Sequence, residues 1–156
     1  MDPRLQAFLA NPVMVVLAAG TKNGRAALAR GMGVRVHPGN SAVEVFISRA
    51  QWGIIVAALQ PGVRLAVTIV RPETYETYQI KGTVISRQSP DEDTLAFAAQ
   101  YCERISAHLL SLGTLERQIA NWITTEDLVG FHVLTEHLYN QTPGPGAGDL
   151  LPQVGR

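Results

Sequence analysis

The sequence predicts a mainly β fold of the α+β class, in which an antiparallel, barrel-like sheet carries peripheral helices. The first half consists of β-rich runs joined by tight turns, and few connections are long enough to cross over between parallel strands. The second half holds one strongly patterned helix, a short helix and a final strand. A chain of 156 residues, 46% of them hydrophobic, can bury one ordinary core. We therefore expect one domain over residues 1–140 and a Gly/Pro-rich C-terminal arm over 141–156.

Three strands are expected ahead of Ser48. The run PVMVVLAAG is rich in β-formers, and the Asn23-Gly24 pair after it favours a two-residue hairpin turn, because both residues tolerate positive φ angles. ALARGMGVRV is the expected second strand, in which Gly31 and Gly33 indicate a bulge or a close approach to the backbone. HPGN should turn the chain, and AVEVFIS alternates like a third strand.

A short helix and two strands should follow. Ser48 stands three positions ahead of Gln51, which is the spacing of a capping box, and the helix is expected to run to about Leu59 before QPG stops it. VRLAVTIVRP and TYETYQIKGTVISR are the next strands. In the second of them Gln79 and Lys81 share one side.

The strongest helix signal lies in SPDEDTLAFAAQYCERISAHLL. Ser89 is the expected cap, Pro90 lies in the first turn, and Asp91 and Glu92 face the positive end of the helix dipole. Apolar residues then recur at three- and four-residue steps. TLERQIANWI predicts a second short helix, and DLVGFHVLTEHLY predicts a last strand, for a total of six strands.

Charge and composition exclude several classes of function. Thirteen basic residues balance thirteen acidic ones, so no excess charge favours nucleic acid or an anionic membrane. The first residues do not resemble a secretory leader, and no stretch is long enough to span a bilayer. We therefore expect a cytoplasmic protein without nucleic-acid or membrane partners. Cys102, the only cysteine, lies in an apolar helical pattern that indicates a buried, inert thiol.

No catalytic or metal-binding motif is present. The four histidines are His37, His108, His132 and His137, and no pair has metal-ligand spacing. The last two are five residues apart on one predicted strand, which places them on opposite sides of it. RGMGVR and GPGAG do not complete a dinucleotide fingerprint. The sequence therefore predicts no metal site, and it leaves any catalytic residue unknown.

The junction VFISRAQWG is the best candidate for binding an anion. A strand that ends at Ser48-Arg49 and opens a helix presents free backbone N–H groups, a hydroxyl and a guanidinium, which together suit a phosphate. An ordinary helix cap with a solvated arginine is the alternative.

The order of the segments adds a family resemblance. The stretches RAALARGMGVRV, VEVFISRAQ, VRLAVTIVRPETYETYQIKG and NQTPGPGAG resemble those of the pyridoxamine 5'-phosphate oxidase-like, FMN-binding split-barrel family over most of residues 12–148. QIKG and QTPGP look like those of one bacterial branch. The resemblance implies a six-stranded split barrel that forms a homodimer and holds FMN between its subunits. A flavoprotein of this kind is an FMN-dependent oxidoreductase acting on a small-molecule substrate or electron donor.

The resemblance also implies which residues bind the cofactor. The second strand would face the flavin with Arg30, Gly31 and Met32. The strand-to-helix junction would hold its phosphate with Ser48 and Arg49, beside Gln51 and Trp52. Gln79 and Lys81 would reach flavin polar atoms across the dimer interface, with a solvated strand face as their alternative reading.

The tail departs from true pyridoxamine phosphate oxidases. It has GDLLP where they carry an arginine-containing motif, and the carboxylate of Asp149 disfavours a phosphorylated vitamin as substrate. TPGPGAG is expected to form an extended arm over the dimer interface, or else to be disordered. Alternative functions are a split-barrel binding or sensor protein for a flavin, deazaflavin or haem, and a dimer that has lost its cofactor.

Overall fold

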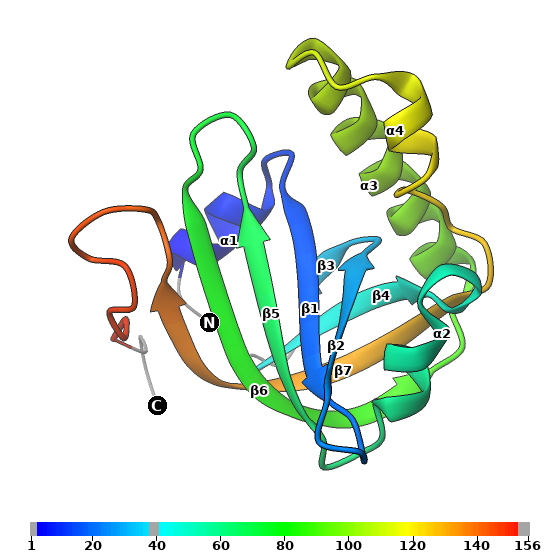
Figure 1. Cartoon of the computed structure of the whole chain (residues 1–156), viewed down its shortest axis with the longest axis vertical. Helices are drawn as coiled ribbons and strands as arrows, with labels where there is room; N and C mark the ends of the chain where they lie inside the picture. Colours follow the sequence, from blue (N-terminus) through cyan, green and yellow to red (C-terminus); the bar gives the residue numbers. More distant parts are fainter. Residues whose placement is uncertain (1–2, 38–40, 153–156) are drawn as a thin grey trace.

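The computed structural model describes residues 3–37 and 41–152 of the chain (Figure 1). Within these ranges the helices are α1 (Pro3–Leu9), α2 (Arg49–Ala58), α3 (Glu92–Ser111) and α4 (Glu116–Ala120). The strands there are β1 (Met14–Gly20), β2 (Ala26–Gly31), β3 (Val34–Val36), β4 (Ala42–Ser48), β5 (Arg64–Val70), β6 (Thr77–Gln88) and β7 (Leu128–Asn140). The α3–α4 pair stands to one side of the curled sheet, and none of the described helices crosses the front of β5 and β1 in Figure 1.

All these strands join one antiparallel sheet in the order β2-β1-β5-β6-β7-β4-β3. The long strands β6 and β7 curve, because their pairing shifts register between Lys81 and Gly82 and again between Val84 and Ser86. A Cβ atom at Gly82 would overlap the carbonyl oxygen of Leu134, so glycine alone permits this approach. The predicted mainly β fold with an antiparallel, curled sheet and peripheral helices is therefore confirmed.

The sheet has seven described strands, and the prediction of six is wrong because the expected second strand is divided into β2 and β3. Up to Gly31 the chain pairs with β1, and after Gly33 it pairs with β4. Met32 N–H donates to the carbonyl of Phe46 over 2.7 Å at this point. Gly33 has a φ of +130°, and a Cβ there would lie 2.9 Å from the Phe97 ring. The two glycines thus mark a change of pairing partner and a close approach.

The hairpin predicted after β1 is present, but its turn is longer than the expected two residues. Thr21 N–H donates to the carbonyl of Arg25 over 2.7 Å, which leaves Lys22 to Gly24 as the loop. Gly24 has a φ of +71°, whereas Asn23 is not among the residues with positive φ. This combination is typical of a type I turn followed by a left-handed residue. The expected HPGN turn lies mainly in residues 38–40, outside the described residues.

The core lies inside the curled sheet and draws residues from every described strand. Leu17, Val67, Ile80 and Phe131 are all fully buried, and such side chains each contribute about 1.5–3 kcal/mol by leaving water. Helix α1, for which the sequence shows no predicted helix signal, adds Leu5 and Phe8 to this core.

Helix α3 has the predicted apolar face but a different cap. Its N-cap is Asp91, whose carboxylate accepts a hydrogen bond from Thr94 N–H over 2.8 Å, so the assignment of Ser89 is wrong. Cys102 is half-buried, and burial raises the pKa of its thiol to about 11, as expected of an inert thiol. None of the helices in the described ranges is long and apolar enough to cross a bilayer.

The C-terminal segment folds back on β7, so the expectation of an extended arm is wrong for residues 141–152. Asn140 N–H donates to the Asp149 carbonyl over 2.9 Å, and Leu151 N–H donates to the Leu138 carbonyl over 2.8 Å. The start of the segment is also held, because Thr77 N–H donates to the Thr142 hydroxyl over 3.0 Å. Residues 153–156 of the predicted arm lie outside the described residues.

Candidate functional site

The outer side of β2, β1, β5 and β6 forms a surface that we call the open face. Its side chains alternate with the buried residues of the same strands. One row crosses all four strands and contains Arg30, Val16, Thr68 and Gln79. The neighbouring row contains Leu28, Ala18, Ala66 and Lys81. These eight residues define the open face.

Three of the predicted cofactor residues, Arg30, Gln79 and Lys81, are thereby brought onto one surface. The Gln79 amide donates to the Thr68 hydroxyl over 2.9 Å, and the Lys81 ammonium lies 4.7 Å from the centroid of the Tyr139 ring. An open depression of about 290 Å³ lies at the Lys81 end of this face, where small residues such as Ala18 and Ala66 line it and Lys81 and Arg64 border it. Arg30 and Gln79 lie in the neighbouring row, outside this depression. A flat ring can lie on its apolar floor.

Arg30 is the most distinctive cation of this surface. Its guanidinium lies 4.6 Å from the centroid of the Trp122 ring, and no carboxylate in the described part of the chain pairs with it. Burial lowers the pKa of Arg30, an effect that nearby Tyr101 partly opposes. An arginine remains charged despite such a shift. Arg30 is thus a partly desolvated cation that can pair with an external anion or carbonyl.

The predicted phosphate cradle at the start of α2 is already filled by the chain itself. Ser48 is fully buried, and its hydroxyl donates to the carbonyl of Glu126 over 2.8 Å while capping Gln51 N–H over 3.3 Å. Arg49 pairs with Asp127 through two hydrogen bonds of 2.7 and 2.8 Å. Arg49 N–H also donates to the carbonyl of Asp127 over 2.9 Å. Asp127 therefore engages the guanidinium and the backbone N–H of Arg49 that a phosphate at this junction would use.

The junction nevertheless lies beside the open face. The Gln51 amide donates to the carbonyl of Asn121 over 3.2 Å, and the next residue along the chain, Trp122, packs on Arg30. The Gln51 side chain is thus used in this contact, and not in the hydrogen bond with the backbone N–H of Ser48 that would complete the predicted capping box. Trp52 has a kinked backbone, and its buried Nε1–H has no hydrogen-bond partner.

Gly31 and Met32, also predicted to face the cofactor, point into the protein. A Cβ atom at Gly31 would lie 2.7 Å from a methyl carbon of Val15, so the glycine permits packing within the barrel. The Met32 side chain is 1% exposed and packs with Phe46 and Ala98. In a single chain these two residues offer no side-chain atom to a ligand on the open face.

A bulge in β7 places two histidines on the same side of the sheet, against the expectation of opposite sides. His137 pairs with Lys81 and Thr135 pairs with Gly82, so one extra residue lies between them on β7. Val133 and Leu138, each of which follows a histidine, are both core residues. His132 and His137 therefore both point outward, and exposed His137 borders the open face.

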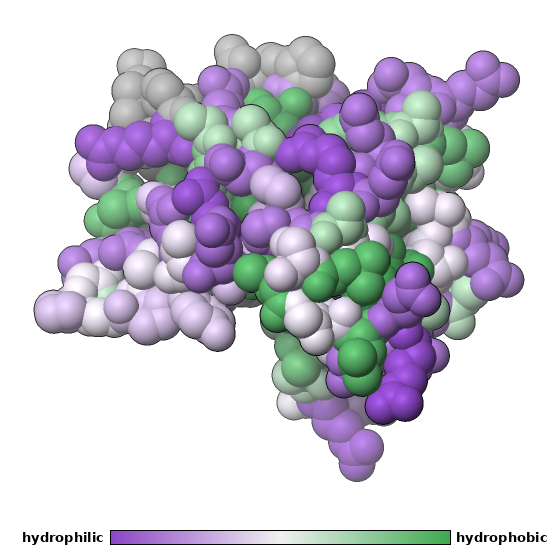
Figure 2. All heavy atoms as spheres, turned by 90° about the horizontal axis from the view of Figure 1, so that it is seen from above, coloured by the Kyte–Doolittle hydropathy of each residue, from purple (hydrophilic) through white to green (hydrophobic). Residues whose placement is uncertain are grey.

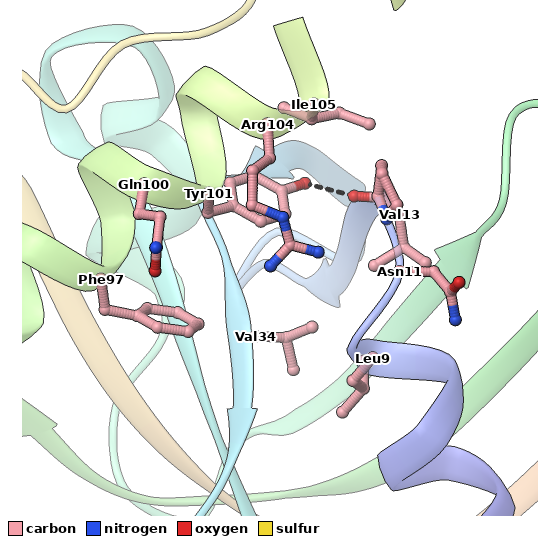
Figure 3. Close-up of a pocket in the computed structure, with 10 residues that line it drawn as sticks. Leu9, Asn11, Val13, Val34, Phe97, Gln100, Tyr101, Arg104 and Ile105 are labelled. Atoms are coloured by element: carbon pink, nitrogen blue, oxygen red, sulfur yellow. Dashed lines mark hydrogen bonds between the residues drawn. The ribbon is translucent and has the colours of Figure 1, made fainter. Parts of the chain in front are cut away.

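The pocket between α1, β3 and α3 is too small for a cofactor (Figure 3). Leu9, Val34, Tyr101 and Ile105 line it, and the Tyr101 hydroxyl donates across its edge to the Val13 carbonyl over 2.8 Å. Its volume of about 30 Å³ has room for roughly two water molecules.

A further exposed apolar area lies where α3 leads into α4. Leu110, Leu112 and Leu115 are 42–49% exposed there. Figure 2, which views this end of the molecule, shows hydrophobic residues interrupted by hydrophilic ones.

Comparisons with known proteins agree on the fold. No protein-family model and no curated protein matches the chain. Among solved structures, an F420 reductase matches with a TM-score of 0.53 and 16% identity, over 85% of this chain and 94% of that one. HutZ, the haem storage protein of Vibrio cholerae, matches with a TM-score of 0.50 and 17% identity, over 89% of this chain and 93% of that one. A pyridoxamine 5'-phosphate oxidase-related, FMN-binding protein from Nostoc punctiforme matches with a TM-score of 0.50 and 14% identity, over 98% of this chain and 99% of that one.

The fold and the site therefore define a split-barrel protein with an uncovered, cation-bordered outer face. The fold is that of the pyridoxamine 5'-phosphate oxidase-like proteins, as the sequence resemblance implied. At these identities the likeness establishes the fold alone.

Proposed function

We propose that the protein is a homodimeric flavoprotein that binds FMN on the open face, between two copies of the chain. The observation that carries the proposal is the row from Arg30 to Gln79, which sets a guanidinium on one side of Val16 and the hydrogen-bonded Thr68–Gln79 pair on the other. The fold supports it, because the Nostoc protein is described as FMN-binding. An open strip of small residues does not enclose a ring by itself, so the second copy would complete the site.

The ring end of FMN fits the residues present. Flavin carbonyl and ring nitrogen atoms accept or share hydrogen bonds, and Arg30, Gln79 and Lys81 offer guanidinium, amide and ammonium donors. Ala18 and Ala66 between them provide a flat surface for the ring. The side chains of this face would orient the ring and exclude water from it.

The phosphate end fits less well, because Arg49 and the first N–H of α2 are engaged by Asp127. Phosphate binding at this junction requires Asp127 to move aside. When bound, FMN supplies the electron or hydride transfer to a small-molecule substrate or electron donor. The open face itself contains no carboxylate, histidine or cysteine that could serve as an acid or base.

The test is a titration of the purified protein with FMN and with riboflavin, followed by flavin fluorescence. Arg30→Ala should weaken binding of both ligands about 10–30-fold, as expected for loss of a hydrogen bond from a charged donor. Arg25→Ala, which removes an exposed arginine from the β1–β2 loop, is the matched control and should leave both affinities unchanged. Equal affinities of the two variants would contradict the assignment.

Haem is the second candidate, favoured by the position of His137. This exposed imidazole pairs with Lys81 across β6 and β7, beside the open face, and imidazole is a common axial ligand of haem iron. The likeness to HutZ points to the same group. A haem titration that produces an axial-histidine spectrum in the wild type but not in His137→Ala would favour haem over FMN. A deazaflavin, suggested by the F420 reductase, would compete with FMN for the same face.

A further inference from the structure

Two histidines and a carboxylate converge on the outer side of β3, β4 and β7. Strand pairing sets Glu44 between His132 on β7 and Arg35 on β3. His37 extends the ladder beyond β3, since its N–H donates to the carbonyl of Ala42 over 3.0 Å. The rings of His37 and His132 are 4.5 Å apart between centroids. One potential ligand atom from each of His37, Glu44 and His132 lies within 4.8 Å of the other two.

The carboxylate of this cluster is held in a fixed orientation. Glu44 is only 8% exposed, although it is a charged residue. One of its oxygens forms an ion pair with Arg35, and the other lies 2.5 Å from Nε2 of His132. A buried carboxylate with both oxygens engaged needs little further ordering to become a ligand.

The ring nitrogen of His132 that would not bind the metal has a hydrogen-bond partner, as is usual for metal-binding histidines. The Ser86 hydroxyl lies 3.2 Å from Nδ1 of His132. In the tautomer that carries its proton on Nδ1, the ring donates to Ser86 and directs the lone pair of Nε2 toward Glu44. A cation can then take the place of the proton that otherwise lies between Nε2 and the carboxylate.

We propose that His37, Glu44 and His132 bind one divalent transition-metal ion such as Zn²⁺. Two imidazoles and a carboxylate form the ligand set of open zinc and non-haem iron sites. Tetrahedral coordination at about 2.0–2.1 Å requires ligand atoms about 3.3 Å apart. The Glu44 oxygen and Nε2 of His132, which are 2.5 Å apart, must therefore separate slightly. His37, whose ligand atom lies within 4.8 Å of the other two, must move in by at most roughly 1.5 Å. His37 has room to do so, because it lies half-exposed at the edge of the cluster.

The surrounding charges and side chains are compatible with a cation. Arg35 also pairs with Asp93 over 2.9 Å, so its positive charge is shared between two carboxylates, and the three groups together carry one negative charge. The exposed Gln88 amide lies 2.8 Å from Nε2 of His132 and must turn aside. Its own oxygen, or a water molecule, can then occupy the fourth position.

This site is independent of the proposed flavin site, because it uses other strands and shares none of the open-face residues. The metal test therefore gives its answer whether or not the protein binds FMN. The full chain is stripped with a chelator, dialysed and titrated with Zn²⁺ by calorimetry. The visible spectrum after adding Co²⁺ reports the coordination number.

We expect one Zn²⁺ per chain and a Co²⁺ spectrum of a four-coordinate site. His37→Ala and His132→Ala should each weaken Zn²⁺ binding at least about 100-fold. His108→Gln removes a histidine near the far end of α3 and should bind like the wild type. His37→Ala is the decisive variant, since its imidazole makes no hydrogen bond to any residue that the structure describes. Zn²⁺ binding as tight in this variant as in the wild type, or no stoichiometric binding at all, would overturn the proposal.

Discussion

Two parts of the sheet's outer surface, the open face and the β3–β4–β7 side, differ in whether an arginine has a carboxylate partner. Arg30 on the open face packs on Trp122 without a carboxylate partner in the described chain, and burial lowers its pKa. For Arg35 on the β3–β4–β7 side, burial also lowers the pKa, but hydrogen bonds and charges from Glu44 and Asp93 outweigh it and raise the pKa. One cation is thus available to an external group, whereas the other is neutralised within the chain.

The same contrast holds for the apolar residues. On the β3–β4–β7 side Phe46 is covered by Phe97 of α3, with ring centroids 5.6 Å apart. On the open face Leu28 is 63% exposed beside small side chains that none of the described helices covers. An uncovered apolar surface with cations at its border is typical of an interface or a ligand site. The closed side stabilises the subunit, and we propose that the open side binds its partner and cofactor.

The largest expected effect tests whether the open face is an interface between two copies. Ala18→Glu places a carboxylate in the middle of the face, where dimerisation would bury it without a fixed partner. Such a charge costs several kcal/mol, so dimer affinity should fall at least about 100-fold. Analytical ultracentrifugation of both proteins measures it.

Ala57→Glu, at an exposed position of α2 that is not one of the eight residues of this face, is the matched control and should dimerise like the wild type. A wild-type protein that stays monomeric at high concentration would contradict the interface itself. An Ala18→Glu dimer of unchanged affinity would move the interface to another surface.

The second prediction compares how much two Arg–Glu pairs stabilise the fold: Arg35–Glu44 on the β3–β4–β7 side and Arg64–Glu136 between β5 and β7. Glu44→Ala leaves Arg35 and His132, whose side chains are 28% and 16% exposed, without their shared carboxylate. The free energy of unfolding should fall by about 2 kcal/mol, less than for a fully buried pair. Arg64→Ala breaks a pair with Glu136 in which the arginine is 70% exposed, and should change stability by less than about 0.5 kcal/mol.

Urea unfolding of both variants in the presence of a chelator measures the difference and keeps metal binding out of the comparison. Equal losses of stability in the two variants would show that the β3–β4–β7 cluster is no better shielded from water than the surface pair.

The fold could be predicted because local signals and strand order agreed. The hairpin glycine, the alternation in β4 and β6 and the apolar face of α3 depend on neighbouring residues alone, and each was recognised. The division at Gly31 to Gly33 was missed, since the sequence gives the glycines but not the change of pairing partner from β1 to β4. The start of α3 was misplaced because Ser89 and Asp91 are both good caps.

The candidate sites were harder to predict because they are assembled across strands. Arg30 and Gln79 are 49 positions apart in the sequence, and only the register through Val16 and Thr68 shows that they share a row. The cluster of His37, Glu44 and His132 could not be predicted for the same reason, since its three residues come from three different segments of the sheet. No linear spacing encodes them. The bulge that turns His137 outward leaves no signal in the pattern of alternation.

The smallest expected effect concerns Asp127, whose carboxylate engages Arg49 at the start of α2, beside the open face. Hydrogen bonds from Arg49 lower the pKa of Asp127, so this carboxylate stays ionised at neutral and mildly acidic pH and keeps the guanidinium engaged. Asp127→Asn removes the charge while keeping the size of the side chain. We expect FMN to bind about 5-fold more tightly, because its phosphate no longer competes with an anion.

Riboflavin, which has no phosphate, should bind this variant as it binds the wild type. Asp93→Asn breaks the corresponding pair with Arg35 on the β3–β4–β7 side and should change neither affinity. A gain for FMN alone in Asp127→Asn would assign the phosphate to the start of α2. If riboflavin gains as much as FMN, the substitution acts through the shape of the loop before β7, and the phosphate would have to be held by cations other than Arg49.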